Sequence, residues 1–340
     1  MSKGPSVIVA GAGALGLSTA LRLAEAGCSV RVCDPAGEGR ASAVAAGMLA
    51  PVFEAMLDAE TAGDLDLLLA ARDLWPALAQ PCGIVLDRSG TAAVGSEPWV
   101  ADLRTRLARL GVGAGEFATS ARDGLASGLR GLLVHEDWRL EPRPALAALR
   151  AAAEAAGVTF EAVAVRERGA ADWLVVATGA DQSLAQQGPE LGHLTPIKGQ
   201  ILGFPEVRAG GPSLRGEGCY AVPGAQGLAV GATMEPGRAD TEPDPVALAP
   251  LVAAAARLFP RLAEATFTVQ AGVRAATADG LPLVGPSRTP GVILAVGARR
   301  NGWLLAPLVA QTVTACVTGR DAGPYAQRLD PARFEKGGAR

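Results

Sequence analysis

The chain has 340 residues, of which 49% are hydrophobic and 19% are charged, and its formal net charge is −3. Single hydrophobic cores stop growing at roughly 250 to 300 residues, so this length predicts two domains. The composition excludes a disordered polymer, and the slightly acidic balance excludes a general electrostatic attraction to nucleic acid or to an anionic membrane.

The first predicted strand is Ser6–Ala10, a short apolar run that contains β-branched residues. It is followed by the glycine turn GAGALG at 11–16 and by a helix-favouring segment at 18–26. The first glycine of such a turn permits a tight bend, the second lets the backbone approach a pyrophosphate, and the third allows the helix to pack closely on the strand. We therefore predict a dinucleotide site in which the helix N-terminus faces the phosphates.

A second predicted strand at 29–33 ends immediately before Asp34. An acid at this position is placed to accept hydrogen bonds from ribose hydroxyls, and its charge disfavours a 2′-phosphate. The sequence has no second turn of the GxGxxG kind. The motif alone leaves both FAD and NAD open as the dinucleotide.

The next segment, ASAVAAGMLAP at 41–51, consists mostly of small residues. Its backbone amides could lie against a planar ring or a ribityl-phosphate chain, and the alternative is a tightly packed helix start. Further along, WLVVATGA at 173–180 predicts a buried strand that returns the chain to the nucleotide-binding sheet. We place Val163 on the strand that precedes it.

Two apolar segments could be mistaken for export or membrane signals. Val7–Leu23 is better explained by the glycine turn than by a signal peptide. Trp303–Val317 contains Pro307 and Gln311 and is shorter than the roughly 20 residues that a bilayer requires, so it predicts a buried helix.

Five segments in one order carry a resemblance that covers the chain from about Val7 to Pro307. They are GAGALGLSTALRLAEAG, ASAVAAGMLAP, VGATMEPG, AGVRAATADGLPLVG and VGARRNGWLLAP. Together they resemble the D-amino-acid-oxidase superfamily of FAD-dependent oxidoreductases, and within it the glycine oxidase family of thiamine biosynthesis. The last three segments are the more specific ones.

The resemblance implies an α/β fold in which a Rossmann-type FAD-binding domain is interleaved with an α+β substrate domain that contains a mixed, largely antiparallel sheet. We expect residues 1–84, 141–195 and 272–330 in the FAD-binding domain, residues 85–140 and 196–271 in the substrate domain, and a flexible tail at 331–340. The cofactor is expected to be FAD. The expected cofactor-binding residues are Gly11, Gly13, Ala14, Leu15, Gly16, Asp34, Pro35, Ala41, Ser42, Ala46, Gly47, Met48, Val163, Gly297, Ala298, Arg299, Arg300, Asn301, Gly302, Trp303 and Leu304.

Four residues match family positions that bind the substrate. Arg274 would hold a substrate carboxylate through two parallel hydrogen bonds, and the alternative is a surface salt bridge. Arg300 is a second candidate, and its partner could instead be a carboxylate of the protein. Tyr220 would donate a hydrogen bond to the same carboxylate or, alternatively, pack in the core. Met234 would border the substrate or serve as ordinary core filler.

The chemistry that the resemblance implies is transfer of a hydride from the α-carbon of a small amino acid to flavin N5, which gives an imine and, with oxygen, hydrogen peroxide. Once the substrate amine is neutral this step requires no general base, so we assign no catalytic side chain. The helix that begins near Trp303 is expected to direct its positive N-terminus at the pyrimidine edge of the flavin.

The sequence departs from the family pattern at Gly224, at Ala298-Arg299 and at Trp138-Arg139, so a larger or acidic substrate stays open. The rival assignments are a related D-amino acid or sarcosine oxidase or dehydrogenase and, in another class, a flavin-binding module without catalysis. Oxygen is the expected electron acceptor. No cysteine matches a flavin-attachment motif.

Two further features limit the partners and the location. The five cysteines have neither disulfide-framework nor CxxC spacing, which favours reduced thiols and a cytoplasmic protein. His135 and His193 lack the spacing of metal ligands, and no GxSxG turn is present, so we expect no metal and no hydrolase. We expect neither nucleic acid nor membrane as a partner, and the resemblance implies a homo-oligomer.

Overall fold

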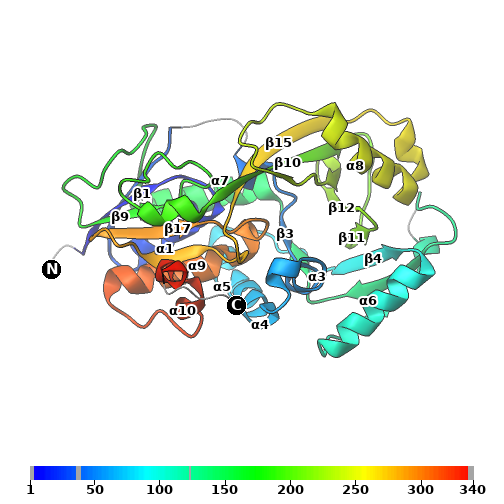
Figure 1. Cartoon of the computed structure of the whole chain (residues 1–340), viewed down its shortest axis with the longest axis horizontal. Coiled ribbons are helices and arrows are strands. Elements are labelled where there is room, and N and C mark those ends of the chain that lie inside the picture. Colours follow the sequence, from blue (N-terminus) through cyan, green and yellow to red (C-terminus); the bar gives the residue numbers. More distant parts are fainter. Residues whose placement is uncertain (1–3, 36–39, 122–123, 336–340) are drawn as a thin grey trace.

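The computed structural model describes residues 4–35, 40–121 and 124–335. Two sheets lie along the long axis of the molecule, with helices packed against both (Figure 1). The chain passes between the sheets several times, because strands from separated stretches of sequence build each of them.

The first sheet has six strands in the order β16-β17-β9-β1-β2-β8, which is the arrangement of a Rossmann-type fold. All neighbours are parallel except β16 and β17. Its strands are β1 (Ser6–Ala10), β2 (Ser29–Cys33), β8 (Thr159–Glu161), β9 (Trp173–Val176), β16 (Leu283–Pro286) and β17 (Val292–Val296).

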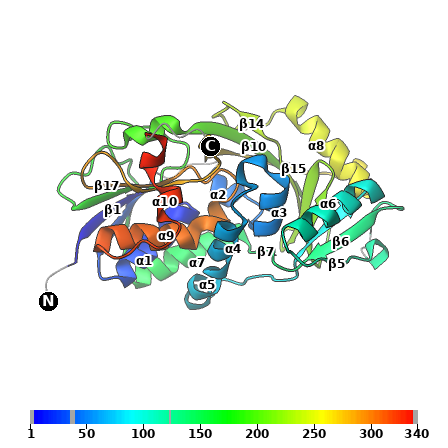
Figure 2. The same ribbon diagram turned by 60° about the horizontal axis from the view of Figure 1, so that its bottom comes forward.

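Side chains that alternate along β1 build a core on each face of this sheet. Val7 and Val9 face a layer of helices, whereas Ile8 and Ala10 face the segment that contains the 3-10 turn at Pro189–His193. The helical layer (Figure 2) comprises α1 (Ala14–Glu25), α4 (Leu65–Asp73), α5 (Trp75–Cys82), α7 (Pro142–Ala155), α9 (Gly302–Thr318) and α10 (Ala326–Leu329). Burial on both faces explains why the central strands β1, β9 and β17 are nearly continuous apolar runs.

The second sheet has nine strands and is mixed but mostly antiparallel, with one parallel pair between β4 and β11. The order is β14-β10-β13-β12-β11-β4-β6-β5, and β15 pairs with β10. Its strands are β4 (Thr91–Gly95), β5 (Gly115–Glu116), β6 (Arg130–Val134), β10 (Thr195–Phe204), β11 (Ser213–Gly216), β12 (Cys219–Gly224), β13 (Gly227–Gly231), β14 (Glu235–Pro236) and β15 (Thr268–Ala276).

Helices cover both faces of the second sheet. Helix α8 (Pro245–Leu258) packs on one face, and α3 (Pro51–Leu57) and α6 (Glu97–Arg109) pack on the other. Between α1 and α3 the chain forms the short helix α2 (Ala41–Val44) and the strand β3 (Met48–Leu49), which pairs with β7 (Trp138–Arg139). The segment 41–51 therefore begins as a helix and continues as an extended backbone.

The predicted fold class is confirmed, and so are the strands at 6–10, 29–33 and 173–176. The buried helix near the C-terminus is also confirmed as α9. In the described part of the chain, no helix has the length and apolar character that crossing a membrane would need. The division into two domains stays a prediction, and β15 lies in the second sheet along its whole length, past the expected switch at residue 272.

Two expectations of the sequence analysis were wrong. Val163 does not lie on a strand, because β8 ends at Glu161, where its pairing with β2 stops. Within the expected tail, Pro331–Phe334 forms a 3-10 turn, and Phe334 stacks on His193 with ring centroids 4.8 Å apart. Residues 336–340 of that tail lie outside the described residues.

Candidate active site

A cavity of about 520 Å³ lies at the carboxyl ends of the parallel strands β1, β2, β9 and β17. This edge of a doubly wound sheet is where dinucleotides bind. Twelve of the predicted cofactor residues line the cavity: Gly11, Gly13, Ala14, Leu15, Asp34, Pro35, Ala41, Ser42, Gly297, Ala298, Arg299 and Gly302.

The glycine turn has the geometry that a diphosphate requires. Gly11 has a φ of +111°, and a Cβ atom there would lie 2.4 Å from the carbonyl oxygen of Ala177. A Cβ atom on Gly16 would lie 2.1 Å from the carbonyl oxygen of Gly11, so this glycine allows α1 to pack on the turn. A Cβ atom on Gly13 would meet only the hydroxyl of Ser42, at 3.1 Å, and would otherwise project into the cavity. These residues fit a dinucleotide.

Asp34 lies in the same cavity, directly after β2. One carboxylate oxygen accepts a hydrogen bond from the backbone N–H of Ala12 at 2.9 Å, and the other forms an ion pair with Arg40 at 2.9 Å. The turn therefore fixes the orientation of this carboxylate within the cavity.

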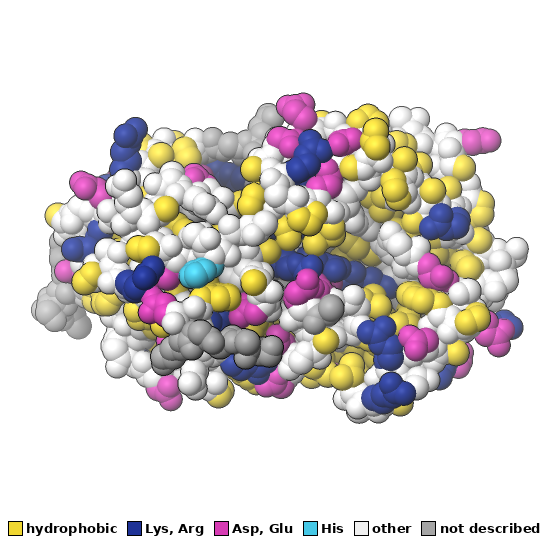
Figure 3. Space-filling view, in the orientation of Figure 1, with side chains coloured by type: hydrophobic (Ala, Val, Ile, Leu, Met, Phe, Trp, Pro, Cys, Tyr) yellow, Lys and Arg dark blue, Asp and Glu magenta, His cyan; other side chains and the backbone are white. Residues whose placement is uncertain are grey.

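A second cavity of about 280 Å³ continues from the first. The two share Ala41, Ser42, Arg274, Arg299 and Gly302 in their linings, so the first residue of α9 lies where they join. Figure 3 shows arginine and lysine side chains gathered in a hollow at the middle of this face of the molecule. The second cavity is also lined by predicted residues Tyr220, Met234, Ala46, Gly47, Met48, Arg300, Asn301 and Trp303.

Arg274 lies on β15, and its guanidinium has no carboxylate partner among the residues that the structure describes. It donates a hydrogen bond to the carbonyl oxygen of Thr233 at 3.3 Å and contacts the sulfur of Met234 at 3.3 Å. Gly199 makes room for it, because a Cβ atom there would lie 2.1 Å from Nη1. Burial lowers the pKa of Arg274, yet an arginine stays charged at neutral pH. A partly buried cation without an anionic partner is poised to bind an anion.

Tyr220 lies on β12 and is only 8% exposed, but its side chain borders the second cavity and is not simply packed in the core. A Cβ atom on Gly231 would lie 2.3 Å from the phenol oxygen, so a glycine is needed beside it. Burial raises the pKa of Tyr220, which keeps the phenol protonated and able to donate a hydrogen bond. Met234 is 37% exposed and borders the cavity.

Glu54 on α3 is a buried carboxylate in the wall of the second cavity that the sequence analysis missed. Its Oε1 accepts hydrogen bonds from Arg215 at 2.5 Å and from Arg300 at 3.2 Å. Burial opposes ionisation, but the charges of Arg300 and Arg215 outweigh it and lower the pKa of Glu54. The alternative of a protein carboxylate as partner of Arg300 is therefore confirmed.

Asp58 and Glu60 provide two further carboxylates near this site. Asp58 forms ion pairs with Arg299 and, at 3.5 Å, with Arg300, and Glu60 pairs with Arg299 at 3.3 Å. The three guanidiniums of Arg215, Arg299 and Arg300 are thus matched by the three carboxylates of Glu54, Asp58 and Glu60. Among the described residues, Arg274 has no such ion pair.

The other expected site residues lie outside both cavities. Gly16 contacts the turn, Leu304 is buried in the core of the first sheet, and Val163 is 48% exposed. The neighbours of Val163, Ala164 and Val165, do line the first cavity. The Trp138-Arg139 pair lines neither cavity.

A fully buried acid, Asp137, makes the stability of the fold depend on pH. Its carboxyl group accepts hydrogen bonds from the backbone N–H groups of Val52 at 2.9 Å and Phe53 at 3.4 Å, and burial raises its pKa from 3.8 to about 7. At a pH between 3.8 and about 7, the carboxyl group of Asp137 holds a proton in the folded protein that it has released in the unfolded chain. Rising pH therefore lowers the free energy of unfolding, by up to ~1.4 kcal/mol per pH unit.

We expect the Asp137→Asn variant to lose less stability than the wild type when the pH rises from about 5 to about 7, because the asparagine has no proton to release. Chemical denaturation of both proteins across this range measures the difference. Parallel pH profiles would contradict the assignment.

Comparisons with known proteins place the chain in a family. Residues 6–316 match the model of the family described as "DAO: FAD dependent oxidoreductase". The chain is 29% identical to the glycine oxidase of Pseudomonas aeruginosa over an alignment of 369 positions, gaps included. This alignment covers 94% of this chain and 98% of that one. It is also 29% identical to the bifunctional protein ThiO/ThiG of Synechocystis sp. over an alignment of 377 positions, which covers 96% of this chain and 54% of the relative. The chain spans about half the length of several curated relatives that it matches.

The fold is also similar to that of a solved glycine oxidase. The crystal structure of glycine oxidase from Geobacillus kaustophilus superposes with a TM-score of 0.83 at 26% sequence identity, covering 97% of this chain and 99% of that one. The glycine turn and the oriented Asp34 fit a dinucleotide, and the family match identifies that dinucleotide as FAD. The chain belongs to the family of FAD-dependent oxidoreductases, with FAD as its cofactor.

Proposed function

We propose that this protein is an oxidase of the glycine oxidase type, which converts glycine or another small amino acid to the imine and reduces oxygen to hydrogen peroxide. The observation that carries the proposal is the unpaired guanidinium of Arg274 beside the phenol of Tyr220, in a cavity that opens into the dinucleotide cavity. When bound, FAD supplies the ring that accepts a hydride and passes two electrons to oxygen.

The side chains of the second cavity would bind and orient the substrate. Arg274 would hold the carboxylate through two parallel hydrogen bonds, and Tyr220 would donate a further one. This grip fixes the α-carbon with respect to the first cavity, and the lone pair of a neutral amine supplies the electrons as the hydride leaves. The ammonium form of the substrate first loses one proton to water, the neutral amine then loses the hydride from carbon to leave an iminium ion, and one proton from water joins that hydride on oxygen as hydrogen peroxide. Because water can accept the first proton, no side chain has to act as a base.

The charge of the cavity favours a substrate with one carboxylate. Arg215, Arg299 and Arg300 already face protein carboxylates, so a second substrate carboxylate would have to compete with Glu54 or Asp58 for its partner. The volume of about 280 Å³ favours a small molecule. Both features support glycine over a dicarboxylic amine.

The relatives support the same reaction, and one of them supports a proposal about the pathway to which the reaction belongs. A ThiO/ThiG protein is among the relatives that align along nearly all of this chain, which supports a place in thiamine biosynthesis, where the imine would feed thiazole formation. We propose in addition that the enzyme works in the cytoplasm as a homo-oligomer. The related alternatives are a sarcosine or D-amino acid oxidase and a dehydrogenase of the same family.

Oxygen uptake and peroxide formation with a panel of amines test this assignment. We expect the highest kcat/KM with glycine, lower values with sarcosine and D-alanine, and a value for iminodiacetate that is lower by about tenfold or more, because its second carboxylate finds no free cation. Reduction of a dye without oxygen uptake would indicate a dehydrogenase. A preference for iminodiacetate over glycine would contradict the charge argument.

A further inference from the structure

One segment forms a wall of both cavities. Residues 232–244, here called the strap, follow β13, include β14 and end at the start of α8. Ala232 and Met234 line the second cavity, here called the substrate cavity. Ala239 and Thr241 line the first cavity, here called the dinucleotide cavity. Whatever fixes the strap therefore acts on both sites.

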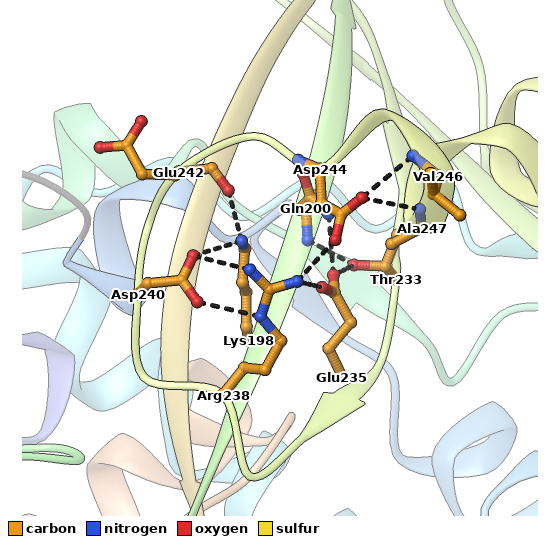
Figure 4. Close-up of polar contacts among 10 residues, drawn as sticks. All are labelled: Lys198, Gln200, Thr233, Glu235, Arg238, Asp240, Glu242, Asp244, Val246 and Ala247. Atoms are coloured by element: carbon orange, nitrogen blue, oxygen red, sulfur yellow. Dashed lines mark hydrogen bonds and ion pairs between the residues drawn. The ribbon is translucent and has the colours of Figure 1, made fainter.

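Strand β10 separates the substrate cavity from the anchor of the strap. Gly199 and Ile201 line the cavity, whereas Lys198 and Gln200, which alternate with them, contact the strap. Both polar side chains belong to residues that are 0% exposed. Figure 4 shows them beneath the loop, within a network of polar contacts.

Lys198 holds the middle of the strap. Its ammonium group forms an ion pair with Asp240 at 2.5 Å and donates a hydrogen bond to the carbonyl oxygen of Glu242. Arg238 links Asp240, at 2.9 Å, to Asp244, at 2.6 Å. Because a buried ammonium without partners is strongly unfavourable, Lys198 disfavours any arrangement in which the strap moves away.

Gln200 holds the two ends of the strap. Its side-chain amide donates to Glu235 at 2.8 Å, and its side-chain oxygen accepts from the backbone N–H of Asp244 at 2.8 Å. Its backbone N–H donates to the hydroxyl of Thr233 at 2.9 Å, and its carbonyl accepts from the N–H of Thr233 at 3.1 Å. The carbonyl of Thr233 in turn accepts the hydrogen bond from Arg274.

We propose that Lys198 is a positioning residue: its ion pair with Asp240 fixes the strap and thereby sets both the retention of FAD and the orientation of the Arg274 guanidinium. The substrate half of this inference rests on the proposed function of Arg274. The cofactor half depends only on the strap as a wall of the dinucleotide cavity.

The test compares Lys198→Met and Asp240→Asn with Arg150→Met, in the FAD-loaded full chain. Arg150 forms an ion pair with Glu154 at 2.9 Å on the surface of α7, with both side chains half exposed, and is the matched control. Asp240 is on the surface side of the pair, at 41% exposure, so its variant leaves the core intact if the lysine variant fails to fold.

We expect Lys198→Met to release FAD roughly tenfold faster, measured by flavin fluorescence after dilution, and to raise KM for glycine roughly tenfold with kcat within about twofold of the wild type. Hydrogen exchange in the strap should accelerate. Asp240→Asn should shift all three quantities in the same direction by less, and Arg150→Met should shift none.

Folded variants with the FAD release and KM of the control would overturn the proposal, and so would faster FAD release with an unchanged KM, because the shared role would be lost. If the wild type oxidises no amino acid, the proposed function fails. In that case FAD release and hydrogen exchange still decide whether Lys198 fixes the strap.

Discussion

Replacing Arg274 with alanine is expected to lower kcat/KM for glycine by about a thousandfold, since removing one partner of a buried charge pair costs roughly 2–5 kcal/mol. The other guanidiniums around the cavity face protein carboxylates and cannot take over without breaking their own ion pairs. KM should rise because the carboxylate loses its anchor, and kcat should fall because the α-carbon is no longer held in line with the first cavity.

Steady-state kinetics per bound flavin measure this effect, and the flavin absorbance shows whether FAD content is maintained. Arg274→Lys is the informative control, because it keeps the charge and loses the two parallel hydrogen bonds, and it should give an intermediate value. An alanine variant within about tenfold of the wild type would mean that the substrate carboxylate binds elsewhere.

Replacing Gly13 with leucine is expected to weaken FAD binding by a factor of roughly 100 or more while the fold persists. The φ of this residue is −79°, which any residue adopts, and a Cβ atom there meets only the Ser42 hydroxyl. The remainder of the leucine side chain would project into the space that the diphosphate needs. The loss of affinity would therefore come from the site and not from unfolding.

Gly192→Leu is the matched control, because a Cβ atom on Gly192 has open space and this glycine lines neither cavity. Fluorescence titration of the apoprotein with FAD gives the affinity, and circular dichroism gives the fold of each variant. Stoichiometric, tightly bound FAD in Gly13→Leu would place the diphosphate elsewhere.

The parts of this site that sequence can predict are those made by consecutive residues. The glycine turn combines a strand, a tight bend and a helix within residues 6–25, so its geometry is fixed locally. Arg274, Tyr220 and Met234 were predicted through the family resemblance, and the structure brings them together from β15, β12 and the strap. Their roles toward the substrate remain predictions.

The anions that neutralise the pocket were not predictable in the same way. Glu54 and Arg215 lie 161 positions apart in the sequence, and only the packing of α3 against the second sheet joins them. A signal did exist, because Glu54 interrupts the apolar run PVFEAML, and a lone acid on a buried helix face needs a cationic partner.

The wrong expectations about Val163 and about the tail at 331–340 also arise from contacts between residues that are distant in the sequence. β8 has three residues at the edge of the first sheet, so its end is set by its pairing with β2 and not by its own apolar pattern. The turn at Pro331–Phe334 is held by long-range contacts, among them the ion pair of Arg333 with Asp279 at 2.8 Å. Neither contact leaves a trace in the local sequence.

The most direct test is to mix the FAD-loaded wild type with glycine in the absence of oxygen while recording absorbance at about 450 nm, where oxidised flavin absorbs. We predict that the absorbance falls as glycine is added and returns with one equivalent of hydrogen peroxide when air is admitted. A flavin band that glycine, sarcosine and D-alanine all leave unchanged would contradict the assignment of this protein as an amino acid oxidase.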